Sequence, residues 1–271
     1  MQLNVIYNKN CLDMLEDVDV SSVDLVFTSP PYNVGKEYER EIDKEYHWRL
    51  LTESSELIYK VLKPTGCYLL NIRDYIEPDG SRSLHLFDLV LYLTRNIGFK
   101  YIETYIWHKG KGLPRKSKFR AWDTFEYIFW FSKTMDFTFN YDKVRVPYKD
   151  ISVQRYKYGV IDRWNRRNGN EYNDKKEVFI HPDGALSSNI LFIGSESTNQ
   201  FHTAVFPVKL AKWAINAATK PGDVVLDCFM GSGSTAVACI ETGRNYIGYE
   251  KEKEYFDFAN KRTLLARPSF L

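Results

Sequence analysis

Short apolar runs alternate with helix-like stretches over much of the chain. The runs 23–28 (VDLVFT), 67–72 (CYLLNI) and 224–229 (VVLDCF) lack strict alternation of apolar and polar residues, and 245–250 is a weaker run of the same kind. Continuous apolar runs of this length are typical of strands buried on both faces of a parallel sheet. We therefore predict four such strands.

Helical periodicity separates these runs. Between 47 and 63, apolar and small residues recur every three or four positions, and Pro64 with Gly66 predicts the end of that helix. The segments 83–97 and 207–218 show a similar pattern. Strands alternating with helices predict an α/β fold with a mostly parallel central sheet flanked by helices.

The middle of the chain departs from this rhythm. The runs 101–107 and 125–131 predict two further strands around a basic loop, after which the chain becomes rich in Tyr, Asn, Arg, Lys and Asp, with weak periodicity. We predict three parts on this basis: 1–134, an irregular insert at 135–200, and 201–271.

Composition is that of an ordinary globular protein. The chain has 271 residues, long enough for one large α/β domain or two small ones. Its net charge of +2 is nearly neutral, so any affinity for nucleic acid must come from local clusters of basic residues. Aromatic residues make up 15% of the chain, a high content that packing in the core or stacking on bases would explain.

Cysteine usage and the N-terminus predict a soluble, cytoplasmic protein. No C-x-x-C pair occurs, no basic-then-apolar signal opens the chain, and no apolar run approaches membrane-spanning length. His181 and His202 are isolated from other metal ligands, so we predict no metal site. The cysteines expected to be reduced and buried are Cys11, Cys67, Cys228 and Cys239.

A glycine-rich turn follows the 224–229 run. Gly231-Ser232-Gly233 lies between this predicted strand and a periodic segment that stops at Gly243. Glycines let the backbone pass close to a ligand, and a helix start offers free amides. A tight structural turn explains the same pattern, so further signals are needed.

Two acidic residues supply those signals. Asp227 ends the strand before the turn, where a carboxylate suits a cationic amine, and Glu250 ends the next predicted strand, where an acid typically binds ribose hydroxyls. Ala236 replaces the third glycine of the dinucleotide pattern, and the chain has no phosphate-binding G-x-x-x-x-G-K-[ST] loop. A nucleoside without a phosphate chain therefore fits best.

The stretch TSPPYN at 28–33 ends another buried strand. Adjacent prolines stiffen this loop and remove two amide donors, leaving carbonyls as acceptors. Together, Ser29-Pro30-Pro31-Tyr32 and the D-x-F-x-G-x-G motif at 227–233 resemble the DNA amino-methyltransferases. The catalytic motif precedes the cofactor motif, as in the circularly permuted β group, and the resemblance covers roughly 1–134 and 201–271.

The resemblance implies a Rossmann-like methyltransferase fold, S-adenosylmethionine as cofactor and double-stranded DNA as partner. Ser29 and the Pro30 carbonyl are expected to accept the two amine hydrogens, and Tyr32 to stack on a flipped base. The segment 201–215 resembles the element that closes over the methionine end of the cofactor. The expected catalytic residues are Ser29, Pro30, Pro31 and Tyr32; the expected cofactor-binding residues are Asp227, Phe229, Gly231, Gly233, Ser234, Glu250, Phe206 and Lys209.

Two basic segments are expected to contact DNA. The loop 108–120 carries six Lys or Arg residues and no acid, and 153–173 interleaves Arg with aromatic residues, which suits base readout. Each of these basic residues, taken alone, is equally compatible with an ordinary solvent-exposed position. The expected DNA-binding residues are Lys109, Lys111, Arg115, Lys116, Lys118, Arg120, Arg155, Arg163, Arg166 and Arg167.

Ser29 favours cytosine N4 as the target, because family members with Ser at this position act more often on cytosine and those with Asp on adenine N6. Adenine N6, an amine of RNA or of another substrate, and a non-catalytic DNA-binding relative stay open as alternatives. Cytosine C5 is disfavoured, since no cysteine here follows a proline. The resemblance is compatible with a restriction-modification system, a separate cognate endonuclease and a homodimer.

Overall fold

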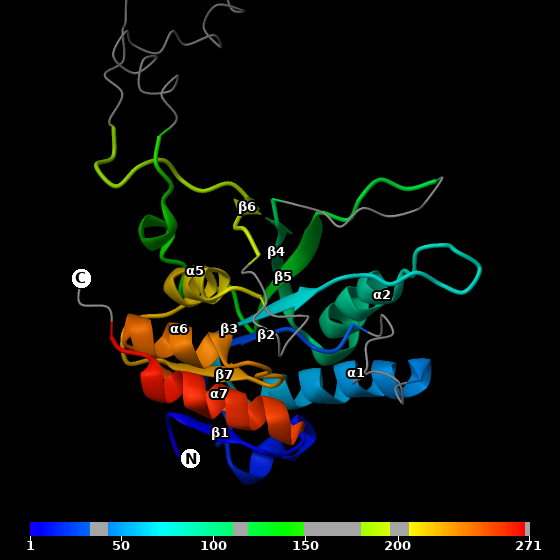
Figure 1. Cartoon of the computed structure of the whole chain (residues 1–271), viewed down its shortest axis with the longest axis horizontal. Coiled ribbons are helices and arrows are strands. Elements are labelled where there is room, and N and C mark those ends of the chain that lie inside the picture. Colours follow the sequence, from blue (N-terminus) through cyan, green and yellow to red (C-terminus); the bar gives the residue numbers. More distant parts are fainter. Residues whose placement is uncertain (33–42, 111–118, 149–179, 196–205, 269–271) are drawn as a thin grey trace, which may run out of the picture. The chain divides into compact units, whose positions relative to one another are not determined.

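The structure, a computed structural model, describes residues 1–32, 43–110, 119–148, 180–195 and 206–268 (Figure 1). The strands are β1 (Val5–Tyr7), β2 (Val23–Thr28), β3 (Leu62–Ile72), β4 (Lys100–His108), β5 (Phe125–Ser132), β6 (Ile190–Phe192), β7 (Val224–Asp227) and β8 (Asn245–Tyr249). The α-helices are α1 (Lys44–Val61), α2 (His85–Tyr92), α5 (Val208–Ala218), α6 (Ser234–Thr242) and α7 (Lys253–Leu265). Shorter helices are η1 (Cys11–Glu16), η3 (Leu93–Ile97) and η4 (Tyr141–Val144).

The strands form one mixed sheet in the order β1-β8-β7-β2-β3-β5-β4-β6. The pairs β1–β8, β8–β7, β7–β2, β2–β3 and β4–β6 are parallel, whereas β5 runs antiparallel to both β3 and β4. The predicted α/β class and mostly parallel sheet are thus confirmed. The two strands predicted around the basic loop are the antiparallel pair β4 and β5.

The pairing of β2 with β7 places the two sequence motifs together. These strands are parallel neighbours, with Leu25 opposite Val225 and Val26 opposite Leu226. The carboxyl ends of parallel strands lie at the same edge of a sheet, and ligands of open α/β sheets bind at that edge. The SPPY loop follows β2 and the glycine turn follows β7, so both loops start there.

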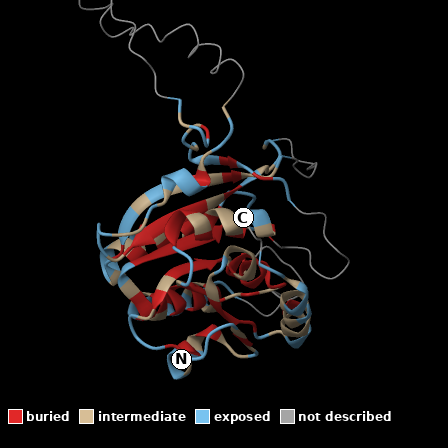
Figure 2. Cartoon of the chain, turned by 90° about the vertical axis from the view of Figure 1, so that its left-hand side faces the viewer, coloured by how far each residue is buried: buried red, intermediate tan, exposed pale blue. Residues whose placement is uncertain are grey.

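The core is formed by alternate strand residues and the helices that cover them. On one face, Val26, Tyr68 and Leu226 join a buried cluster with Leu51 and Ile58 of α1. Figure 2 shows the buried residues concentrated in the sheet and the inner faces of its helices. β2 is buried along nearly its whole length, which explains its continuous apolar sequence.

The helix predicted at 47–63 is α1, and both of its ends differ from the prediction. It begins at Lys44, because the Asp43 side chain caps it by accepting a hydrogen bond from the Tyr46 amide at 2.7 Å. It ends at Val61, and β3 begins at the next residue, so Pro64 and Gly66 lie inside the strand rather than terminating the helix. The segment 83–97 forms α2 followed by the π-helical turn η3.

The chain divides into two compact units. One comprises Met1–Asn140 and Asn189–Leu271, and contains the whole sheet. The other comprises Tyr141–Ser188, in which Val146 pairs with Ala185 through an isolated β-bridge. β6 falls within the predicted insert 135–200 yet is a strand of the main sheet. The boundaries of the three predicted parts stay a prediction.

Two expectations from composition concern burial and membranes. The four cysteines are free and buried, as predicted. Within the described ranges, none of the helices combines the length and apolar character needed to span a membrane.

Candidate active site

The SPPY loop and the glycine turn are joined by a buried hydrogen-bonded cluster. Thr28 Oγ1, at the end of β2, donates to Asp227 Oδ1 at 2.6 Å, and the Phe229 amide donates to both atoms at 3.2 and 3.1 Å. Thr235 Oγ1 of α6 donates to the other Asp227 oxygen at 2.6 Å. The Asp227 carboxylate is fully buried, and this burial raises its pKa to about 6. The buried Asp227 carboxylate thus connects the start of the SPPY loop to the glycine turn.

The catalytic loop carries its own polar network. Ser29 Oγ lies 2.6 Å from Tyr32 Oη, and Tyr32 Oη donates to Glu126 Oε2 on β5 at 2.9 Å. Tyr32 is only 8% exposed, and burial together with the nearby Glu126 carboxylate raises the pKa of its hydroxyl well above the usual value. Tyr32 is therefore a neutral phenol, and its hydroxyl links Ser29 to a buried acid.

The loop is also attached to α1. His47 Nε2 donates to the Pro31 carbonyl at 2.7 Å; a carbonyl can only accept, so this ring nitrogen carries the proton. His47 is 3% exposed and its ring lies beside that of His85, with centroids 5.6 Å apart. The Pro31 carbonyl is thereby directed toward the helix.

The glycine turn is shaped by close approaches on both sides. The Gly231 amide donates to Glu250 Oε2 at 2.8 Å, and Glu250 Oε1 accepts from the Glu252 amide at 2.9 Å. Gly233 has φ of +84°, and a Cβ there would lie 3.0 Å from Ala259 Cβ of α7. Glycine is required at this position both for its left-handed backbone and for the packing of α7.

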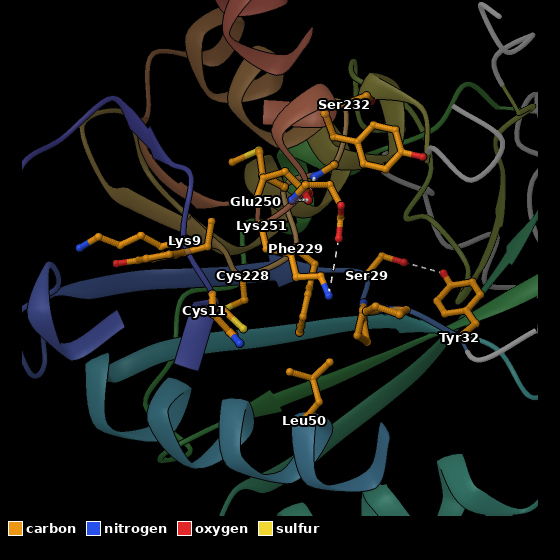
Figure 3. Close-up of a pocket in the computed structure, with 18 of the residues that line it drawn as sticks. Lys9, Cys11, Ser29, Tyr32, Leu50, Cys228, Phe229, Ser232, Glu250 and Lys251 are labelled. Atoms are coloured by element: carbon orange, nitrogen blue, oxygen red, sulfur yellow. Dashed lines mark hydrogen bonds and ion pairs between the residues drawn. The ribbon is translucent and has the colours of Figure 1, made fainter. Parts of the chain in front are cut away.

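One cavity extends over both loops. Figure 3 shows Ser29, Phe229 and Glu250 facing it, with the Ser29–Tyr32 hydrogen bond at one end. Burial raises the pKa of Glu250, although the two backbone amides lower it. Predicted site residues that line the cavity are Ser29, Pro30, Pro31, Tyr32, Phe206, Phe229, Gly231, Ser234 and Glu250.

Three predicted cofactor-binding residues lie outside the cavity lining. Asp227 is buried beneath the turn with its oxygens occupied by protein donors, and Gly233 packs against α7. Lys209 is exposed on α5. Phe206, by contrast, reaches the cavity and packs on Phe27 of β2, with ring centroids 4.9 Å apart.

Most predicted DNA-binding residues lie outside the described residues. Of the two that are described, Lys109 pairs with the buried Glu126 and lies 4.9 Å from the centroid of the Trp107 ring. Arg120 donates to the Gly80 carbonyl. Those outside are Lys111, Arg115, Lys116, Lys118, Arg155, Arg163, Arg166 and Arg167.

Several site residues escaped the sequence analysis. Lys9, Asn10 and Cys11 line the cavity because β1 pairs with β8, whose end carries Glu250. A signal was present for Glu126, since a lone acid inside the apolar run 125–131 is unusual in a buried strand. In the part of the chain described, no three His, Cys, Asp or Glu side chains are arranged to hold a metal ion.

The fold and this two-loop cavity define a methyltransferase class, and comparison with known proteins specifies it. Residues 23–261 match the family described as DNA methylase, comprising N6 and N4 methyltransferases. The chain therefore belongs to the family of DNA amino-methyltransferases, and S-adenosylmethionine is its cofactor. The predicted family, Rossmann-like fold and cofactor are confirmed.

Individual relatives cover nearly the whole chain. The type II methyltransferase M1.MboII of Moraxella bovis is 32% identical, over 96% of this chain and 96% of its own length. M.BglII of Bacillus subtilis is 31% identical, over 95% of this chain and 68% of its own. The solved structure of the PvuII cytosine-N4-specific DNA methyltransferase superposes with a TM-score of 0.72 and 25% identity, covering 95% of this chain and 85% of that one.

Proposed function

We propose that this protein methylates the N4 amine of a flipped cytosine in double-stranded DNA, as the modification enzyme of a restriction-modification system. The observation that carries the proposal is the Ser29 hydroxyl, which lines the same cavity as the glycine turn. The likeness to a cytosine-N4-specific enzyme supports it. A separate endonuclease partner and a homodimer stay predictions.

The residues of the cavity fit S-adenosylmethionine. Glu250 retains acceptor capacity for ribose hydroxyls, because each of its oxygens receives one backbone amide while a carboxylate oxygen can accept two hydrogen bonds. Phe206 and Phe229 supply apolar walls of the cavity that Glu250 and Ser29 also line. When bound, the cofactor would supply the methyl group, with the carbon–sulfur electron pair leaving on sulfur; the nitrogen that gains the methyl group would lose one of its two hydrogens as a proton to solvent.

The SPPY loop is proposed to prepare the target amine. Ser29 Oγ and the Pro30 carbonyl accept its two hydrogens, which draws the nitrogen toward tetrahedral geometry and frees its lone pair. The Pro31 carbonyl accepts from His47 of α1, which orients it toward that helix and favours the Pro30 carbonyl for this role. Tyr32 contacts the flipped ring and holds it at reacting distance.

Target recognition is proposed for residues 135–200, and phosphate contact for the basic loop 108–120. Most basic residues of both segments lie outside the described residues. Of the basic residues of the loop, Lys109 and Arg120 are described: the Lys109 ammonium pairs with Glu126, and Arg120 donates to the Gly80 carbonyl. Arginine in such a region can bridge guanine O6 and N7.

The product identifies the target. The protein is incubated with tritium-labelled S-adenosylmethionine and unmodified genomic DNA of mixed sequence, the DNA is digested to nucleosides, and the label is assigned by chromatography. Label in N4-methyldeoxycytidine is expected. Label in N6-methyldeoxyadenosine would show that adenine N6, and not cytosine N4, is the target. In a parallel incubation that contains both DNA and RNA, label found in the RNA alone would contradict the proposal that DNA is the substrate.

A further inference from the structure

Glu126 is a buried acid that the proposed mechanism does not yet use. It lies in the apolar strand β5 and is 5% exposed. A carboxylate in such a position is costly unless its oxygens are paired and hydrogen-bonded. Its partners are Lys109 at Oε1, and Tyr32 and Asn71 at Oε2, at 2.9 and 3.2 Å.

These partners make Glu126 an acceptor. The Lys109 ammonium and the Asn71 amide nitrogen have only hydrogens to offer, so both carboxylate oxygens face donors. The Tyr32 hydroxyl has a single hydrogen, which is directed at Glu126 Oε2. Its oxygen therefore faces Ser29 as an acceptor.

The single hydrogen of the Tyr32 hydroxyl also determines the direction of the hydrogen bond with Ser29. Since Tyr32 has no second hydrogen to give, the Ser29 hydroxyl must donate its own hydrogen across the 2.6 Å contact (Figure 3). Both lone pairs of Ser29 Oγ then remain as acceptors for the target amine. Hydrogen bonds arranged in a chain also polarise one another, which raises the negative charge on Ser29 Oγ.

We infer that Glu126 is a positioning residue for methyl transfer, which acts through Tyr32 to hold the Ser29 hydroxyl with its lone pairs toward the target amine. This inference rests on the proposed role of Ser29, and applies equally to a cytosine or an adenine amine. Asn71 and Lys109 keep Glu126 in place.

A double-mutant cycle tests the inference. Glu126→Gln keeps the shape but removes the charge, and Tyr32→Phe keeps the ring but removes the hydroxyl. Each is expected to lower kcat by about tenfold or more, the loss typical of one misaligned catalytic hydrogen bond, with KM for DNA and S-adenosylmethionine within twofold of wild type. The double variant is expected to match Tyr32→Phe within twofold, because Glu126 acts only through that hydroxyl.

Glu103→Gln on the neighbouring strand β4 is a matched charge change outside the site, and wild-type kcat is expected. Tyr32→Phe leaves Glu126, Asn71 and Lys109 paired, so it tests the chain of hydrogen bonds even if Glu126→Gln does not fold. An unchanged kcat in Tyr32→Phe, or losses that multiply in the double variant, would overturn the inference. Wild-type protein that methylates no DNA would instead overturn the proposed function.

Discussion

The Thr28 hydroxyl donates to the Asp227 carboxylate at 2.6 Å, although 199 residues separate them along the chain. Thr28 precedes the SPPY loop and Asp227 precedes the glycine turn, so this bond fixes the spacing of the two loops that share the cavity. Because both residues are fully buried, it forms where water does not compete. The pairing of β2 with β7 therefore brings the two loops together, and the buried hydrogen bonds around Asp227 hold them there.

Stability should depend on pH through Asp227. Burial raises its folded-state pKa from an ordinary 3.8 to about 6, so the folded chain holds this proton to a higher pH than the unfolded chain. The resulting stabilisation is complete below about pH 4 and is lost as pH rises through 6, amounting to about 3 kcal/mol. Asp227→Asn should remove this contribution. Urea unfolding is measured from pH 4.5 to 7.5. As pH rises, the unfolding free energy of wild type should fall relative to that of Asp227→Asn. An equal pH dependence of the unfolding free energy in the two proteins would contradict the raised pKa of Asp227.

Two glycines with left-handed backbones allow a matched comparison. Gly243 has φ of +70° with no heavy atom within 4 Å of an added Cβ, whereas at Gly233 the added Cβ also meets Ala259 at 3.0 Å. Gly243→Ala should cost about 1 to 2 kcal/mol of unfolding free energy from backbone strain alone. Gly233→Ala should cost more, and Ala259→Gly in the same chain should restore part of the excess. Equal losses, measured by urea unfolding, would show that α7 does not constrain the turn.

The bond between His47 and the Pro31 carbonyl should matter for turnover. Removing the donor with His47→Ala frees the SPPY loop from α1, and kcat should fall by roughly tenfold. Gln can still donate from its amide, so His47→Gln should retain more activity than His47→Ala. S-adenosylmethionine affinity, measured by calorimetry, should change little in both variants. Equal kcat in the two variants would indicate that the hydrogen bond is unimportant.

Glu250 should control cofactor affinity. The Glu250 carboxylate now accepts hydrogen bonds from two backbone amides. In Glu250→Gln, the side-chain NH2 group faces one of these amides, so two donors oppose each other. This disturbs the turn and weakens the contact with the ribose. We expect the Kd for S-adenosylmethionine to rise by about tenfold, equivalent to one hydrogen bond. Lys220→Ala, an exposed change beyond α5, serves as control. Calorimetry showing the same Kd for Glu250→Gln and wild type would remove Glu250 from the cofactor site.

Much of this fold was predictable because buried parallel strands have a distinctive sequence. The run 23–28 coincides with β2, and 101–107 falls within β4. β1 and β6 were missed because three residues are too few to show a period. α7 was missed because only Ala259 among its residues is buried, so its sequence lacks an apolar stripe.

The site was predictable where motifs carry the signal and not where tertiary contacts do. Ser29 and Gly231 were found from local sequence and share the cavity. That Asp227 turns inward to Thr28 and Thr235 depends on the β2–β7 pairing, which local sequence does not encode. Likewise, Glu126 reaches Tyr32 only because β5 lies next to β3 in the sheet.

The most direct measurement compares wild type with Ser29→Ala, using labelled S-adenosylmethionine, duplex DNA and nucleoside analysis. Wild type should yield N4-methyldeoxycytidine, and Ser29→Ala should lose about 100-fold or more in rate while its cofactor Kd stays within twofold of wild type. Full activity in Ser29→Ala, or no methylated amine in DNA exposed to wild type, would contradict the account.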